Sequence, residues 1–257
     1  MNNTKPATLP RRRFLLNLAF ALCFLASSVR AAADLPATQT AAGVPEKAVR
    51  VACVGDSITF GSGIKNRQNE SYPAVLGRLL SAGWEVRNFG VSGATVLHKA
   101  DKPYLKQKAH SDALAFAPDI LVIMLGTNDS KHRGHGNETN AVANNWQYQA
   151  DYVPDYERLI AEFRKANPSV KVYVCLPTPC FPGRWGINDQ TIHDEIIPMI
   201  RQVAQTSNAI IIDLNSALAG RQDLFPDTVH PNTAGAKLMA ETVYQALTGN
   251  AATAQAK

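Results

Sequence analysis

The segment VACVGDSITFG, residues 51–61, decides the fold and contains the first candidate reactive group. A nearly continuous apolar run ends at Gly55, and Asp56 and Ser57 follow it directly. A short, uninterrupted apolar run is typical of a strand that is covered on both faces, as in a parallel sheet. Ser57 is therefore either an ordinary turn residue or a nucleophile held at the end of a buried strand.

Five strand-like segments alternate with amphipathic helical patterns along the chain. The alternation predicts a parallel α/β sheet with helices on both faces, built as one domain over 47–249. The predicted strands cover 49–55, 84–90, 119–126, 170–177 and 209–214. The predicted helices cover 72–83 with Gly83 as a left-handed cap, 155–167 before Pro168, 191–205, and a last helix from Asn232 to just before Gly249.

The first 33 residues have the pattern of a secretory signal peptide. Three arginines, Arg11 to Arg13, precede the apolar run FLLNLAFALCFLASSV (14–29), and small residues allow cleavage near Ala31 or Ala33. The order Arg-Arg-x-Phe-Leu also resembles a twin-arginine signal. The alternative is an uncleaved membrane anchor, but no long stop-transfer segment follows. We expect a periplasmic or secreted protein, exported by the Sec or twin-arginine route, without stable membrane insertion after cleavage, and with flexible tails over 34–46 and 250–257.

The excess positive charge lies in that leader. The chain has 26 basic and 21 acidic residues, a net charge of +5, and residues 1–31 hold five of the basic residues and none of the acidic ones. Without the leader the two signs balance, so the isoelectric point near 9.0 gives no argument for a nucleic-acid or acidic partner. The sequence makes no prediction of the oligomeric state.

Three cysteines remain outside the leader: Cys53, Cys175 and Cys180. Two of them lie within predicted strands, which favours buried free thiols. A disulfide bond between Cys175 and Cys180 is the alternative. The spacing of the three matches no zinc-binding pattern.

Candidate reactive residues follow the predicted strands. Ser57 follows the first strand, Gly93 the second and Asn128 the third, while Asp227 and His230 lie between the fifth strand and the last helix. Ligands of open parallel sheets bind at the carboxyl ends of the strands. We therefore expect these five residues to meet there, in loops rather than in helices.

Their side chains fit acyl transfer. A serine hydroxyl needs a base within hydrogen-bond reach, and Asp227 lies three residues before His230, close enough to orient its ring. Pro231 favours an extended backbone at His230. Asn128 offers a neutral donor for a developing oxyanion, a type of contact worth about 3–4 kcal/mol. Each motif taken alone also fits ordinary turn chemistry, including an exposed His230 in a loop that caps the last helix.

Taken together, four sequence blocks resemble those of a known enzyme family. They are GDSITFG (55–61), NFGVSGA (88–94), GTND (126–129) and DTVHPN (227–232). In this order they resemble the blocks of the SGNH (GDSL-type) hydrolases, over nearly the whole mature domain. The resemblance implies a flavodoxin-like three-layer α/β/α sandwich with a five-stranded parallel sheet. The chain lacks Gly-x-Ser-x-Gly, the nucleophile motif of the α/β-hydrolases.

The resemblance also implies a role for each residue. Ser57 is the implied nucleophile, His230 the base and Asp227 the carboxylate that orients it. Ser57, Gly93 and Asn128 form the implied oxyanion hole. Chemistry of this kind requires neither a metal nor an organic cofactor. The two acidic residues of the matched blocks, at 56 and 129, are expected to hold loops by hydrogen bonds.

Two long loops indicate the substrate. Residues 130–155, with Trp146, and residues 178–189, with Trp185, are expected to overhang the catalytic end and to contact substrate. Aromatic rings with amide side chains suit a sugar, although packing beneath the loops is the alternative. The motifs GTNDSK, WGIND and HPN resemble those of bacterial esterases that deacetylate carbohydrates, including sialate and xylan acetylesterases. An acetyl group on a glycan hydroxyl is the expected substrate.

Other functions also fit parts of the sequence. A lysophospholipase, thioesterase or arylesterase of the same family requires an apolar acyl groove, and a glycan-binding module without catalysis requires no intact triad. The spacing of His132, His135 and Glu138 suits a metal site only on a helix, which Gly134 and Gly136 disfavour. The segment GSGIKN lacks the third glycine of a dinucleotide-binding loop.

Overall fold

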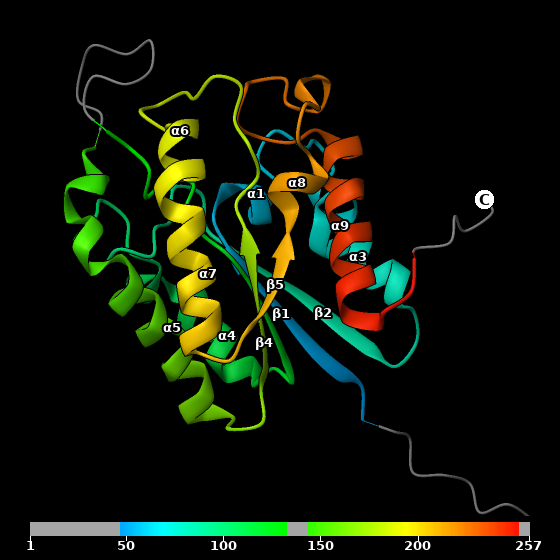
Figure 1. Cartoon of the computed structure of the whole chain (residues 1–257). Coiled ribbons are helices and arrows are strands. Elements are labelled where there is room, and N and C mark those ends of the chain that lie inside the picture. The colour runs from blue at the N-terminus through cyan, green and yellow to red at the C-terminus, as the bar shows by residue number, and fades with distance from the viewer. Residues whose placement is uncertain (1–46, 133–142, 252–257) are drawn as a thin grey trace, which may run out of the picture. The chain divides into compact units, whose positions relative to one another are not determined.

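The apolar run that ends at Gly55 is an inner strand of a five-stranded parallel sheet, as Figure 1 shows. The computed structural model describes residues 47–132 and 143–251, which all fall within one compact unit, Val44–Lys257. The strand order is β2-β1-β3-β4-β5. The strands are β1 (Val49–Gly55), β2 (Trp84–Gly90), β3 (Ile120–Met124), β4 (Lys171–Leu176) and β5 (Ile210–Asp213).

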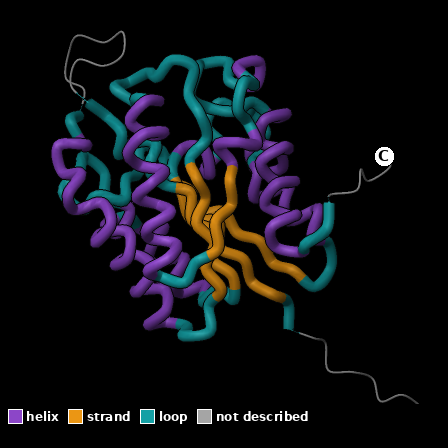
Figure 2. The backbone as a smooth tube through the Cα atoms, viewed as in Figure 1, coloured by secondary structure: helices purple, strands orange, loops and turns teal. Residues whose placement is uncertain are grey.

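Helices cover both faces of this sheet, so that the described residues form three layers (Figure 2). One face packs against α3 (Tyr72–Leu80) and α9 (Thr233–Thr248). The other packs against α4 (Lys108–Phe116), α5 (Tyr152–Ala166) and α7 (Ile197–Thr206). The shorter elements are α1 (Ser57–Phe60), α2 (Arg67–Glu70), α6 (Asp189–Thr191), α8 (Leu214–Ala217), the turns η1 (Tyr104–Lys106), η2 (Asn145–Asp151) and η4 (Gln222–Leu224), and the π-helical turn η3 (Ile192–Ile196).

Burial on both faces explains the uninterrupted apolar strands. Successive side chains of a strand point to opposite faces, and here Ala52 and Val54 enter one core cluster while Val51 and Cys53 enter the other. Every residue of β3 is buried. The predicted five-stranded parallel α/β architecture is confirmed, with strand ends that differ by up to two residues from those expected.

Two helical predictions need correction, and one helix was not predicted. The helix expected over 72–83 ends at Leu80, because Ser81 already has a positive φ of 60°; Gly83, with φ 90°, lies in the turn that follows. The segment 191–205 is not one continuous α-helix but passes through η3 before α7. Pro198 has no N–H to donate back along the helix, which disfavours regular α-helical bonding there. The helix α4 was not anticipated, since its sequence KAHSDALAF is only weakly amphipathic.

The last helix follows the expected capping chemistry. The side chain of Asn232 accepts a hydrogen bond from the Gly235 N–H at 3.0 Å, and Gly249 ends the helix in the left-handed conformation. This cap fixes the chain directly after His230. The loop that carries His230 is therefore anchored to a 16-residue helix.

The cysteines outside the leader are buried free thiols, so the disulfide alternative is not adopted. Burial raises the pKa of Cys53 to about 12, which keeps this thiol protonated and unreactive. Among residues 47–132 and 143–251, we find no helix with the length and apolar character needed to span a bilayer.

Candidate active site

The serine lies at a sharp turn from strand to helix. β1 ends at Gly55, and Asp56 caps α1 by accepting the Ile58 N–H at 2.9 Å. A side chain at Gly55 would place its Cβ 2.0 Å from the Thr59 Oγ1, so only glycine allows this close return of the chain. Ser57 is thus the first residue of α1 rather than a loop residue, which corrects the expectation that no helix carries a reactive group.

A short loop before α9 holds His230 and its aspartate together. Oδ1 of Asp227 accepts the backbone N–H groups of Val229 at 3.1 Å and His230 at 2.7 Å, and Oδ2 lies 2.7 Å from the His230 Nδ1. Burial by itself would raise the pKa of Asp227, but these bonds outweigh it and hold the pKa below its ordinary value. The carboxylate is therefore ionised and acts only as an acceptor.

The ionised carboxylate fixes the tautomer of the histidine. Because Asp227 can only accept, Nδ1 of His230 must carry the proton of their hydrogen bond. The other ring nitrogen, Nε2, then offers a lone pair, and it lies 2.8 Å from the Ser57 Oγ. The serine hydroxyl donates this bond. The structure joins the three predicted residues in one series of hydrogen bonds, Asp227–His230–Ser57, in which His230 and Ser57 are 173 positions apart in the sequence.

Gly93 lies in a tight turn that follows β2. The Ala94 N–H bonds to the Val91 carbonyl at 3.0 Å, and Gly93 has a φ of 82°, which an L-residue rarely adopts. No hydrogen bond joins the N–H groups of Ser57 or Gly93 to another described residue. Both groups are therefore without a protein acceptor among the described residues, and their role in an oxyanion hole stays a prediction.

Asn128 links the surroundings of Ser57 and Gly93. Its Nδ2 donates to the Ala94 carbonyl at 3.2 Å and lies 3.4 Å from the Asp56 Oδ2. The contact with Asp56 is long for a hydrogen bond. The Nδ2–H that points toward Asp56 is therefore the more available donor of the two. Ala94 follows Gly93 and Asp56 precedes Ser57, so the Asn128 amide contacts a chain neighbour of each of the other two proposed donors.

Asp56 and Asp129 hold loops by hydrogen bonds, as expected. The carboxylate of Asp129 accepts the N–H groups of Val96 at 3.1 Å and Leu97 at 2.9 Å, which ties the GTND block to the loop after β2. Both side chains are completely buried. Burial raises the pKa of Asp56 to about 6 and that of Asp129 to about 7.

The two tryptophans have different surroundings. Trp185 is half-buried, its ring centroid lies 5.4 Å from that of His230, and the Arg184 guanidinium stacks over it at 4.7 Å. Trp146 is only 1% exposed, donates to the Glu195 carboxylate at 2.9 Å and packs edge-on against Tyr152. The predicted substrate contact by Trp146 is therefore replaced by a packing role beneath the loop, whereas Trp185 borders the candidate site.

Sequence reasoning missed one residue that supports the site. Asn145 is buried, its Nδ2 donates to the Asn128 carbonyl at 2.9 Å and to the Asp101 carboxylate at 2.8 Å, and its Oδ1 accepts the Asp101 N–H. These bonds hold the backbone of Asn128 from the side of the long loop. An asparagine in an amide-rich loop gives no signal in sequence that distinguishes it from its neighbours.

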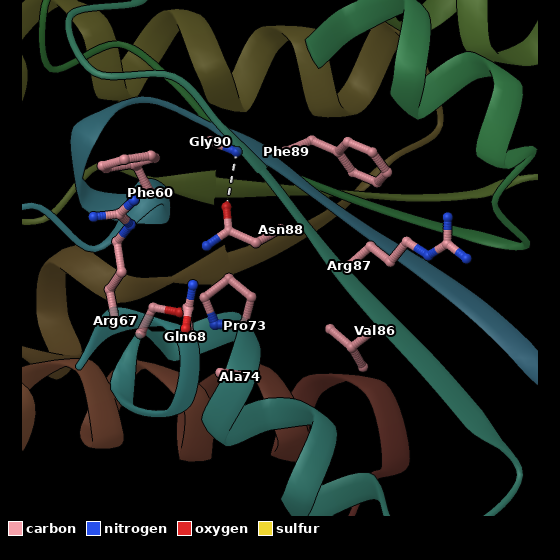
Figure 3. A pocket seen from close by; sticks show the side chains of 11 residues that line it. Phe60, Arg67, Gln68, Pro73, Ala74, Val86, Arg87, Asn88, Phe89 and Gly90 are labelled. Atoms are coloured by element: carbon pink, nitrogen blue, oxygen red, sulfur yellow. Dashed lines mark hydrogen bonds between the residues drawn. The ribbon is translucent and has the colours of Figure 1, made fainter.

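A cavity of about 510 Å³ lies apart from the Asp227–His230–Ser57 chain, at the free edge of β2 (Figure 3). Its lining includes Phe60 of α1, the helix that begins at Ser57, and Gly90 at the end of β2. In Figure 3 the amide of Asn88 accepts the Gly90 N–H, a bond of 2.8 Å that fixes the end of this strand. The cavity contains neither Ser57 nor His230 in its lining.

Part of the long loop falls outside the described residues. His135 and Glu138 lie there, so two of the three side chains of the alternative metal site fall outside the described residues. The backbone N–H of His132 bonds to the Gly186 carbonyl at 3.0 Å. Within residues 47–132 and 143–251, no group of three or more metal-ligating side chains is clustered.

Comparison with known sequences identifies the family. The sequence model of the GDSL-like lipase/acylhydrolase family matches residues 53–238, a span that contains the whole candidate site. The chain is a member of the GDSL-like lipase/acylhydrolase family. Membership confirms the resemblance drawn from the four sequence blocks.

Two relatives of this chain have a named activity. An acetylxylan esterase of Xylanibacter ruminicola is 42% identical over 220 residues, which cover 79% of this chain and 44% of the relative. An acetylxylan esterase of Geobacillus stearothermophilus is 26% identical over 205 residues, which cover 73% of this chain and 88% of the relative. The chain thus spans less than half of the Xylanibacter protein and most of the Geobacillus protein.

Two solved esterase structures share the fold. The crystal structure of an acetylxylan esterase from Geobacillus stearothermophilus superposes with a TM-score of 0.60 at 23% identity, and the match covers 82% of this chain and all of that one. The M. smegmatis aryl esterase gives a TM-score of 0.60 at 20% identity, covering 79% and 99% of the two chains. At these identities the match establishes the fold alone.

Proposed function

We propose that this protein is an exported serine esterase that removes acetyl groups from carbohydrate hydroxyls, with acetylated xylan as the first substrate to test. The observation that carries the proposal is the hydrogen-bonded chain from Asp227 through His230 to Ser57. Membership of the GDSL-like family and the two acetylxylan esterase relatives support the choice of ester.

The first half of the reaction forms an acetyl-enzyme. As the Ser57 Oγ attacks the acetyl carbonyl carbon, its proton passes to Nε2 of His230, and Asp227 stabilises the imidazolium without taking the proton itself. The carbonyl oxygen becomes an oxyanion and is met by the N–H groups of Ser57 and Gly93 and by the Asn128 amide. When the C–O bond to the sugar breaks, the proton on Nε2 moves to the departing alkoxide.

The second half restores the enzyme. A water molecule takes the place of the departed alcohol and gives a proton to His230 as its oxygen attacks the acetyl-serine carbonyl. The same three donors stabilise the second oxyanion. The bond to the Ser57 Oγ then breaks, the proton returns from Nε2 to the serine, and acetate leaves.

The surroundings of the histidine favour a sugar as the alcohol. The half-buried ring of Trp185 lies beside His230 and offers an apolar face, and Arg184 next to it offers hydrogen-bond donors. Pyranose rings present both apolar C–H surfaces and hydroxyl groups, which suits such a pair. We expect sugar contacts from Trp185 and none from the buried Trp146.

Acetate release from acetylated xylo-oligosaccharides tests the function. The wild-type protein should release acetate, and Ser57→Ala should not. His193→Ala is a matched control for His230→Ala, because His193 also pairs with an aspartate, Asp194 at 2.9 Å, but lies on the exposed face of a helix. A preference for an octanoyl over an acetyl ester contradicts the acetyl assignment and favours a lipase-like substrate. Oligosaccharide binding without any effect of Ser57→Ala on hydrolysis favours a binding module.

Export is proposed from the sequence of the leader. N-terminal sequencing of protein recovered from the periplasm or medium should begin close after Ala31 or Ala33. Recovery of the full-length chain in the membrane fraction contradicts the proposal and supports an anchor. Replacing Arg11 and Arg12 with lysine separates the two routes, because only twin-arginine export should then stop.

A further inference from the structure

In the turn that contains Gly93, the backbone hydrogen bonds do not fix the orientation of the central peptide, Ser92–Gly93. Residues 91–94 form a β-turn closed by the Ala94 N–H and the Val91 carbonyl, with Gly93 at φ 82° and no positive φ at Ser92. These features define a type II turn. In a type I turn the Ser92–Gly93 peptide is rotated by roughly 150–170°, while the outer residues stay in place. Glycine accepts both conformations at little cost.

The two ends of the turn are firmly attached. Before it, the Gly90 N–H bonds to the Asn88 side chain, as Figure 3 shows, and the Val91 N–H bonds to the Gly55 carbonyl at 2.9 Å. After it, the Ala94 carbonyl accepts the Asn128 amide. These bonds hold both type I and type II turns equally well, so they do not select the orientation of the central peptide.

The side chain of Lys102 selects the orientation of the Ser92–Gly93 peptide. Nζ of Lys102 donates to the Ser92 carbonyl at 2.8 Å. In a trans peptide the C=O and N–H point in opposite directions, so the ammonium on the carbonyl side directs the Gly93 N–H away from itself. A flip to type I would turn the Ser92 carbonyl away from the lysine and break this charge-assisted bond.

Lys102 is itself held in place for this contact. Its backbone carbonyl accepts the Thr95 N–H at 3.0 Å, and the next residue, Pro103, pairs with Thr95 in an isolated bridge. Its side chain lies over Gly93, where a Cβ on the glycine would come within 3.5 Å of the lysine Cδ. No carboxylate of the described residues lies within ion-pair distance of Lys102, so no acidic side chain competes for the ammonium.

We propose that Lys102 is a positioning residue for the oxyanion hole, which locks the Ser92–Gly93 peptide in the orientation that presents the Gly93 N–H to the substrate. The inference rests on the proposed esterase function and on the donor role of Gly93. The lysine touches neither the substrate nor the reacting atoms. It also polarises the peptide it binds, which strengthens the Gly93 N–H as a donor.

The test compares Lys102→Met with Lys102→Arg in steady-state hydrolysis of a small acetyl ester. Met keeps the stem over Gly93 but donates no hydrogen bond, whereas Arg keeps a charged donor. We expect Lys102→Met to lower kcat about tenfold, a fraction of the loss caused by deleting a donor, with KM within about twofold. Lys102→Arg should retain most of the wild-type kcat. Lys106→Met is the control and should match wild type, because Lys106 is exposed like Lys102 and its Nζ also donates to a backbone carbonyl, that of His98 at 3.4 Å.

A double-mutant cycle identifies the peptide through which Lys102 acts. Alanine at position 93 disfavours the positive φ of a type II turn, so Gly93→Ala should already release the peptide. Adding Lys102→Met to Gly93→Ala should then change kcat less than twofold. Additive losses, an unchanged kcat in Lys102→Met, or a raised KM with kcat unchanged overturn the proposal, the last because it indicates a substrate contact.

A crystal structure of Lys102→Met provides a readout that does not depend on activity. We expect the Ser92–Gly93 peptide in the type I orientation or in a mixture of the two. An unchanged type II turn with full occupancy overturns the proposal. If the wild-type protein hydrolyses no acetyl ester while this peptide flips in the variant, the proposed function is wrong, but Lys102 still fixes the orientation of the Ser92–Gly93 peptide.

Discussion

Nε2 of His230 lies 2.8 Å from the Ser57 Oγ, although the two residues belong to opposite ends of the domain sequence. β1 and the cap of α1 place the serine, and the Asp227 carboxylate with the start of α9 places the histidine. Each partner is fixed by its own local hydrogen bonds. The contact therefore exists before substrate arrives, and it does not require a rearrangement of the loops.

Ser57→Ala and His230→Ala should each lower kcat for acetyl ester hydrolysis by at least about 10³-fold, and the double variant should be little worse. The reason is that both residues serve one proton transfer. Steady-state kinetics of the three variants measure this, with the exposed Ser111→Ala as a control for serine loss. Losses that multiply in the double variant speak against a shared step.

Asn128→Ala should lower kcat by about 10²–10³-fold while KM changes little, because its amide meets charge that develops only in the transition state. Asn167→Ala provides a matched control. Asn167 also donates to a backbone carbonyl, that of Pro118 at 2.9 Å, but it follows α5 at the end of the helix before β4. An Asn128→Ala enzyme with wild-type kcat removes this residue from the oxyanion hole.

Asp227→Asn should change the pH dependence of stability. The folded pKa of Asp227 is below its ordinary value, so the folded state binds the proton less tightly than the unfolded chain does. This contribution to stability is complete above about pH 5 and is lost as the pH falls through the folded pKa. Urea midpoints of wild type and variant, measured from pH 7 to pH 3, should differ most above pH 5 and converge in acid.

The same variant has a second readout and a clear contradiction. Asparagine can present its NH₂ to the imidazole and favour the wrong tautomer, so kcat should fall by about 10²–10⁴-fold at neutral pH. A stability difference that grows on acidification contradicts the lowered pKa. An unchanged kcat contradicts the orienting role of Asp227.

Trp185→Ala should raise KM for acetylated oligosaccharides by about three- to thirtyfold and change KM for a small acetyl ester much less, because only a sugar reaches the ring. Trp84→Ala is the control, since Trp84 begins β2 and lies at the amino end of that strand. Equal effects of Trp185→Ala on both substrates indicate that the ring supports His230 rather than the sugar.

The sequence predicted those features that depend on local pattern. Buried parallel strands have uninterrupted apolar runs, so β1 and β3 were visible, and the strand-end rule then brought Ser57, Asn128 and His230 to one edge. The Asn232 cap of α9 followed from its side chain and the Gly249 stop. These are positions at which one residue type has one dominant physical use.

The remaining features depend on tertiary contacts. Trp146 is an aromatic residue in an amide-rich loop, which suggests sugar binding. Its indole N–H instead donates to the Glu195 carboxylate, 49 residues away, and Tyr152 packs against its ring. Asn145 supports Asn128 through bonds that no local pattern encodes. Lys102 reads as an ordinary surface lysine until the turn at Gly93 is seen beside it.

Trapping the covalent intermediate tests the central claim most directly. The protein is mixed with an acetyl ester, quenched in acid within milliseconds and mapped by peptide mass spectrometry. One acetyl group on Ser57, formed by wild type and absent from both Ser57→Ala and His230→Ala at the same time point, is the predicted result. Acetylation of a different residue, or continued turnover by Ser57→Ala with no label at all, would contradict the account.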